Sequence, residues 1–203
     1  MPRISKSAVT TFALQILMNM SKRNRSNHEL AESLGNRVES QLKMAIATFQ
    51  NLPEHILTRP SNTGGWSIAQ CLWHLNSYGH HYLPHLTQSL QNANDCKPDQ
   101  LFKPGWLGNY FSNLMEPGPK MKTIKADKAH TPPAISEPYP VIAEFIHQQE
   151  TLLSLIEQAR RKDLNKRTVP VSILPWLKLK PGDVLSFIVS HNERHLQQAI
   201  RNL

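Results

Sequence analysis

The sequence has little cysteine and no long apolar run. Its 203 residues include only Cys71 and Cys96, whose spacing fits neither a zinc ribbon nor a CxxC redox motif. The longest apolar run, around residues 12–20, is too short to span a bilayer. We therefore expect a cytoplasmic protein with no disulfide framework and no transmembrane segment. Met20 offers a second start, so it stays open whether residues 1–19 belong to the native protein.

Acidic residues are missing from the start of the chain. The formal net charge is +8, and five positive charges precede the first acid, Glu29. Subtracting these five leaves the rest of the chain with only +3. A basic start can attract phosphate surfaces, but a nearly balanced body argues against a nucleic-acid-binding domain. We divide the chain into a basic N-terminal extension, residues 1–25, and one domain, residues 26–203.

Helical periodicity predicts an all-α fold. Apolar residues recur at spacings of three and four in four stretches: 26–53, from 66 onward, 140–159 and 183–202. Ser26 or Asn27 is the expected N-cap of the first helix, Ser67 that of the second and Asp183 that of the fourth. No alternating pattern indicates strands. The sequence therefore predicts a four-helix bundle.

Prolines mark the irregular parts of this pattern. Pro84 lies within the second helix and should kink or end it nearby. Eight prolines fall between Asn92 and Pro140, which predicts a long proline-rich crossover between the second and third helices. Within it, the aromatic-rich stretch 101–115 is expected to form a short helix over the bundle. That helix is either a lid or wall of a substrate site or a plain crossover.

Histidine carries the chemistry that the sequence offers. His191 and His195 lie four apart on the apolar stripe of the last helix, so both rings project from one helical face. Two neutral imidazoles at this spacing can chelate one divalent ion, and His74 in the second helix is a candidate third ligand. The chain has ten histidines, so such pairs also arise by chance. The spacing alone therefore leaves hydrogen-bonded core histidines as an equal alternative.

A rival pair, His81 and His85, has the same spacing. Pro84 lies inside this pair and should disturb its geometry. The C-terminal pair is therefore the better predicted chelate.

Glu193 lies between the C-terminal pair but does not follow the zincin pattern, in which glutamate comes directly after the first histidine. Two residues after His191, its side chain should point away from the histidine face, as a solvated surface charge. Arg194 and Gln198 lie nearer that face and are candidates to support the ligands or meet an anion.

Two segments resemble the DinB/YfiT-like superfamily of metal-dependent proteins. One is Trp66-Ser67-Ile68 followed by His74-Leu75, and the other is the run from His191 to Gln198. The resemblance covers about residues 27–202. It implies a four-helix bundle in which one histidine of the second helix and the HxxxH pair of the fourth coordinate a divalent ion. Carried onto this sequence, those ligands are His74, His191 and His195.

The resemblance also implies a range of reactions. Known activities of the family include transfers in which a small thiol such as bacillithiol or mycothiol attacks an electrophile, and related isomerase or hydrolase chemistry. We therefore expect a metal-dependent transferase or hydrolase acting on a small molecule, with thiol-dependent S-transfer favoured. The alternative is a non-enzymatic, metal-stabilised bundle with a stress-response or interaction role.

Three protein ligands leave a coordination position open for water or a thiol. The hypothesis assigns the surrounding substrate contacts to four residues: Tyr78, Arg194, Trp106 and Tyr110. Zinc, nickel, iron and manganese all suit imidazole ligands, so the sequence leaves the metal open. It also leaves a homodimer open.

Overall fold

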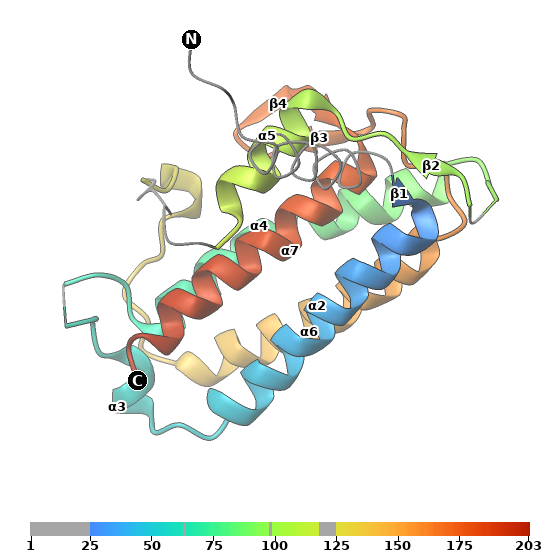
Figure 1. Cartoon of the computed structure of the whole chain (residues 1–203). Coiled ribbons are helices and arrows are strands. Elements are labelled where there is room, and N and C mark those ends of the chain that lie inside the picture. Colours follow the sequence, from blue (N-terminus) through green and yellow to red (C-terminus); the bar gives the residue numbers. More distant parts are fainter. Residues whose placement is uncertain (1–24, 63, 98, 118–124) are drawn as a thin grey trace, which may run out of the picture.

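Four long helices form a bundle in the computed structural model, which describes residues 25–62, 64–97, 99–117 and 125–203. They are α2 (Asn27–Thr48), α4 (Ile68–Gln91), α6 (Pro138–Ala159) and α7 (Pro181–Ile200). Helices α2 and α4 each pack against both α6 and α7, and all four run side by side (Figure 1). The predicted all-α four-helix bundle is confirmed. The predicted basic extension lies outside the described residues, apart from Arg25.

Shorter elements fill the connections. Helix α3 (Glu54–Thr58) lies between α2 and α4, and the long crossover holds β2 (Leu101–Phe102), α5 (Trp106–Met115) and the 3-10 helix η1 (Lys128–His130). Helix α5 packs on α7, as a short helix over the bundle should. Within the described residues, none of the helices combines the length and the apolar character needed to cross a membrane.

Two small antiparallel sheets correct the expectation that the chain has no strands. Strand β1 (Arg25–Ser26) pairs with β2, and β3 (Val169–Val171) pairs with β4 (Leu174–Leu179) across the α6–α7 connection. The alternating pattern that identifies strands needs several residues, and three of these four strands have only two or three. In β4, Pro175 and exposed apolar side chains obscure the pattern.

The helix starts follow the predicted capping chemistry at two of three positions. The hydroxyls of Ser26 and Ser67 accept backbone N–H groups in complete capping boxes at the starts of α2 and α4. Asp183 is not the cap of α7, because the helix already begins at Pro181. Its buried carboxylate instead accepts the backbone N–H of Gly105 at 3.0 Å, which ties the start of α5 to α7. Burial raises the pKa of Asp183 to about 6.

Helix α4 does not end near Pro84 but continues to Gln91. Proline removes the N–H that would bond the carbonyl of His80. Both residues are exposed, so water can satisfy that carbonyl. The helix therefore tolerates the proline.

The apolar core of the bundle is divided in two along α7. Val189 belongs to one cluster of buried side chains, and Leu196 belongs to the other. Helix α4 is divided in the same way, since Leu75 lies in the second cluster and Tyr82 in the first. The polar side chains between these positions therefore meet in the middle of the bundle, where apolar packing would be the norm.

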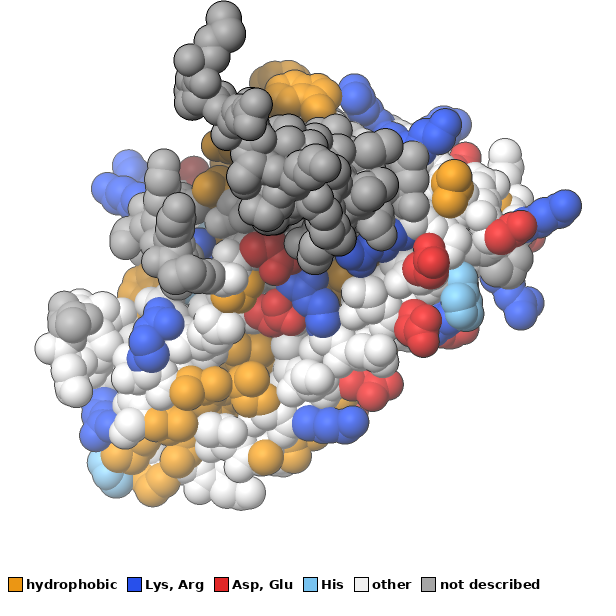
Figure 2. Space-filling model, viewed as in Figure 1, with side chains coloured by type: hydrophobic (Ala, Val, Ile, Leu, Met, Phe, Trp, Pro, Cys, Tyr) orange, Lys and Arg blue, Asp and Glu red, His pale blue; other side chains and the backbone are white. Residues whose placement is uncertain are grey.

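Charges on the visible face are mixed. Lys and Arg side chains alternate with Asp and Glu side chains over the described residues in Figure 2, and no extended patch of one sign forms there. This arrangement agrees with the nearly balanced charge of the domain.

Candidate metal centre

Three histidines meet where the apolar core is interrupted. One ring nitrogen from each of His74, His191 and His195 lies within 4.8 Å of the other two. The Nε2 atoms of His74 and His191 are 3.2 Å apart. His74 and His191 are buried, whereas His195 is partly exposed. We call these residues the three-histidine cluster. Solvent reaches the cluster at His195.

Local structure explains the convergence. His191 and His195 are one helical turn apart on α7, and their ring centroids are 4.8 Å apart. Helix α4 packs directly against α7 and brings the ring of His74 to 5.0 Å from His191 and 4.5 Å from His195. Two neighbouring helices thus supply all three rings.

Hydrogen bonds fix the orientation of two of the rings. His74 Nδ1 lies 2.6 Å from the carbonyl oxygen of His130, and His195 Nδ1 lies 3.0 Å from Gln198 Oε1. Both partners are acceptors, so each Nδ1 donates its N–H. The Nε2 atom of each neutral ring then keeps a free lone pair. Such bonds to the far nitrogen are the usual support of metal-binding histidines.

Burial keeps the cluster uncharged. Loss of hydration lowers the pKa of His74 to about 4 and that of His195 to about 3. The fully buried His191 has a pKa well below its ordinary value for the same reason. All three imidazoles are therefore neutral at neutral pH, and the neutral ring is the form that binds metal.

The donor set fits a divalent cation. In a tetrahedral zinc site, Zn–N bonds of about 2.0–2.1 Å place two nitrogens roughly 3.4 Å apart, close to the separation of His74 Nε2 and His191 Nε2. Without a cation, two facing nitrogens can share only one proton. A cation would use every lone pair that the three neutral rings direct inward.

Aromatic side chains surround the cluster. The Trp66 ring stacks on His195 with centroids 5.8 Å apart and lies 4.8 Å from His74. The predicted contact residue Tyr78 sits on the other side, 4.5 Å from the ring of His191 and 5.1 Å from that of His74. Burial raises the pKa of Tyr78 to about 12, so its hydroxyl remains a neutral donor.

His130 belongs to the site but was not among the predicted residues. Its ring stacks on Tyr78 with centroids 3.9 Å apart. Its Nδ1 lies 2.9 Å from the Ser77 hydroxyl, and its Nε2 lies 3.1 Å from that of Ser172. His130 stands in the proline-rich crossover, outside any periodic stretch, and no spacing signal in the sequence points to it.

The remaining predicted contact residues lie outside the cluster. Arg194 is buried, and its guanidinium donates to the Leu114 carbonyl in α5 at 3.3 Å. Trp106 and Tyr110 on α5 are 76% and 56% exposed. Trp106 lines a small pocket beside Asp183, eight residues or about 12 Å along α7 from His191. Their contact with a substrate stays a prediction.

Glu193 points away from the histidines, as expected, but it is not a solvated charge. Its carboxylate pairs with the Arg37 guanidinium at 2.5 Å, and its side chain is only 25% exposed. Arg37 also pairs with Glu116 at 3.2 Å, just after α5. This network joins α2, α7 and the end of α5, so Glu193 supports the fold next to the cluster.

Fold and site together define a class of protein, an all-α bundle with a three-histidine cluster able to hold a divalent metal. The family model of the DinB superfamily matches residues 37–199, and the chain belongs to that superfamily. Comparisons with curated proteins and with solved structures gave no significant match.

Proposed function

We propose that this chain is a metal-dependent enzyme for a small-molecule substrate, with the ion held by His74, His191 and His195. The convergence of three neutral imidazole rings, two of them buried, carries the proposal. A bound divalent cation supplies a Lewis acid that makes a coordinated water or thiol nucleophilic near neutral pH. Three protein ligands suit such a catalytic role, since a structural zinc site normally has four.

The surrounding residues would position the reactants. The His130 carbonyl and Gln198 hold two ligand rings in place through their Nδ1 atoms. The neutral phenol of Tyr78 lies beside His191 and can donate a hydrogen bond to an oxygen that gains negative charge. Trp66 covers two ligand rings and keeps water from them on that side.

Thiol-dependent transfer is the reaction we favour, with a small cofactor thiol as the nucleophile. The chain's own thiols are poorly suited to this role. Cys71 is fully buried, and burial raises its pKa to about 12. Cys96 lies in the turn after α4, where its sulfur accepts a hydrogen bond from Asn27. A water nucleophile would give a hydrolase instead. A reducing, cytoplasmic setting would suit both free cysteines.

The test begins with metal content. Untagged protein reconstituted with zinc, nickel, iron or manganese should bind about one equivalent, and His195→Ala should bind far less. Less than about a tenth of an equivalent in the parent protein after reconstitution contradicts the site.

Turnover tests the enzymatic role separately. The metal-loaded protein should transfer small thiols to an electrophile such as 1-chloro-2,4-dinitrobenzene, or hydrolyse ester and amide substrates. Tyr78→Phe should lower kcat while leaving metal content unchanged. Full metal occupancy without turnover in any of these assays would favour the non-enzymatic, metal-stabilised bundle.

A further inference from the structure

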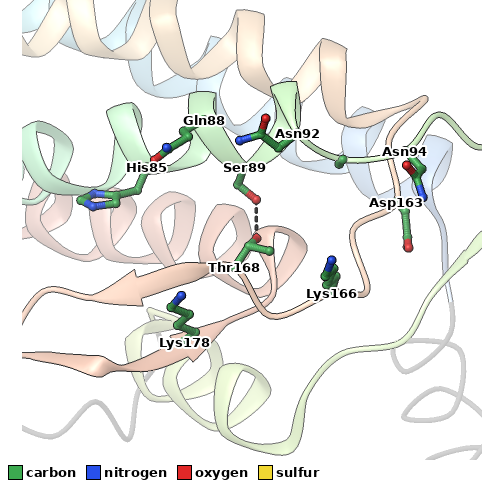
Figure 3. A pocket seen from close by; sticks show the side chains of 10 residues that line it. His85, Gln88, Ser89, Asn92, Asn94, Asp163, Lys166, Thr168 and Lys178 are labelled. Carbon is green, nitrogen blue, oxygen red and sulfur yellow. Dashed lines mark hydrogen bonds between the residues drawn. The ribbon is translucent and has the colours of Figure 1, made fainter.

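A second cavity lies on the other half of α4, away from the three-histidine cluster, and His85 is part of its lining. It is enclosed by the last turns of α4, the turn that follows, the loop from α6 to β3, and strand β4 (Figure 3). Its volume is about 310 Å³, at the small end of the roughly 300–1,000 Å³ typical of small-molecule sites. We call it the lysine cavity, after Lys166 and Lys178 in its wall.

Polar side chains make up almost all of its lining. Ala93 is the single apolar residue among the ten that line it. Gln88, Asn92 and Asn94 contribute amides, which both donate and accept hydrogen bonds. Such a lining offers many hydrogen-bonding groups and suits a molecule that carries hydroxyl groups.

The two lysines give the cavity two positive charges. Figure 3 shows the amino groups of Lys166 and Lys178 turned toward α4 from the opposite wall. Lysine ion pairs within the described part of the chain involve Lys43 and Lys162, and neither cavity lysine has one. An anion is therefore the natural partner of this wall.

The cavity's single carboxylate, Asp163, offsets only one of the two lysine charges. Asp163 Oδ1 already accepts the Asn165 backbone N–H at 3.0 Å and the Gln100 amide at 3.2 Å. Asp163 lies beside Asn94 in Figure 3, at the end away from Lys178. The cavity thus has a Lys178 end and an Asp163 end, with Lys166 between them in Figure 3.

A pair of hydroxyls lies between the two ends. Ser89 on α4 and Thr168 before β3 are hydrogen-bonded to each other. Two hydroxyls carry two protons, and their mutual bond uses one. The other proton is available to an acceptor in the cavity. Ser89 is buried and bonded to Thr168, so both hydroxyls are held in place whichever of them carries the spare proton.

We propose that the lysine cavity binds a small phosphorylated, hydroxyl-bearing molecule. Its phosphoryl group lies between Lys166 and Lys178, and its hydroxyls meet Gln88 and Asn92. A phosphate monoester carries nearly two negative charges at neutral pH, whereas a ligand with one carboxylate carries one. The phosphate ester therefore matches the two lysine ammonium groups better.

This site is separate from the three-histidine cluster. Ser89 is fifteen residues beyond His74 on α4, which corresponds to about 22 Å along the helix. A ligand that fits the cavity does not reach across that distance. The proposal therefore does not depend on the metal or on the reaction proposed above.

Calorimetric titration tests the proposal with three probes: glycerol 3-phosphate, ribose 5-phosphate and glucose 6-phosphate, each against its unphosphorylated parent. At least one phosphate ester should bind, and its parent should not. Lys166→Gln/Lys178→Gln should weaken binding at least about tenfold, the loss expected from removing a charge-assisted hydrogen bond. The control Lys43→Gln/Lys125→Gln removes the same charge from other exposed positions and should bind as the parent protein does.

Three results would overturn the proposal. The first is no binding of any ester up to about 10 mM, which is about ten times the Kd of a weak, 1 mM site. The second is equal affinity in the cavity double variant. The third is loss of binding in His191→Ala, which would place the phosphate at the histidines. Inorganic phosphate that binds as tightly as every ester contradicts the contacts with hydroxyls, whereas weaker binding of phosphate supports them.

Discussion

The protein contains two pairs of histidines four residues apart, and they behave differently. The ring centroids of His191 and His195 are 4.8 Å apart, and those of His81 and His85 are 4.6 Å apart. Helical spacing thus gives both pairs nearly the same ring separation, although the ring planes meet at 36° in the His81–His85 pair and at 86° in the C-terminal pair. Yet within the described residues only the C-terminal pair joins a third ligand-type side chain, His74, in a cluster that can hold a metal.

The difference lies in what surrounds each ring. His81 Nε2 lies 3.1 Å from the Pro170 carbonyl, and His85 Nδ1 lies 2.7 Å from the His81 carbonyl. One ring nitrogen of each of these two histidines is therefore hydrogen-bonded to a main-chain carbonyl oxygen. The Nδ1 bond of His195 to Gln198 leaves the Nε2 lone pair free, and the Nδ1 bond of His85 does the same for that ring. A histidine pair therefore becomes a candidate site through a third ring brought to it by a neighbouring helix, and not through spacing or hydrogen bonding alone.

The largest expected difference between the two pairs is in metal affinity. His191→Ala/His195→Ala removes two of three ligands and should weaken binding by at least about a thousandfold. His81→Ala/His85→Ala should bind as much metal as the parent protein. Elemental analysis of reconstituted, untagged protein measures both, with circular dichroism as a check on folding. Equal loss of metal from the two double variants would break the distinction.

Thermal stability should separate the pairs next. A ligand at about a thousand times its Kd stabilises the folded state by about 4 kcal/mol, so chelation should lower Tm on the order of 10 °C. The His81→Ala/His85→Ala variant should show the same drop. The His191→Ala/His195→Ala variant should show none, and calorimetric scans with and without chelator measure each shift. If chelation lowers the Tm of the parent protein but not that of His81→Ala/His85→Ala, the two histidine pairs do not act independently.

A smaller effect should come from the residue that orients His195. Gln198→Ala removes the hydrogen-bond acceptor of His195 Nδ1. It should weaken metal binding about 10- to 100-fold, the usual loss when a residue that hydrogen-bonds a metal ligand is removed. Gln197→Ala changes the neighbouring exposed glutamine and serves as the matched control. Competition with a fluorescent chelator gives both affinities. Identical affinities would mean that the Gln198 contact does not support the ligand.

The smallest effect is expected from the unclustered pair itself. His81→Ala removes the hydrogen bond to the Pro170 carbonyl and should cost about 1 kcal/mol of unfolding free energy. Urea denaturation of metal-free protein measures it. Metal affinity should stay unchanged, and a change in that affinity would show that the two pairs are coupled.

The three-histidine cluster could be predicted in part because its C-terminal pair follows from local regularity. Helical spacing places His191 and His195 on one face, and the family resemblance selects His74 as their partner. Ser26 and Ser67 were likewise predictable as caps, since a cap is set by residues three positions away. Elements of this kind need no knowledge of distant contacts.

The supporting residues depend on tertiary contacts and were not predictable in the same way. His130 reaches the cluster from a crossover with no periodicity, and Asp183 bonds Gly105, which is 78 residues away. Pro84 failed to end α4 because its environment is solvent, which its position in the sequence does not reveal. The hairpin of β3 and β4 is too short and too rich in proline to show an alternating pattern.

The contact that orients His74 is made by a main-chain oxygen. A substitution such as His130→Ala leaves that oxygen in place, so the ligand can keep its orientation while the side chain at position 130 varies. Inserting or deleting a residue beside it would move the oxygen instead. The His74 contact therefore depends on where the main chain runs beside His130 and not on the type of side chain at that position.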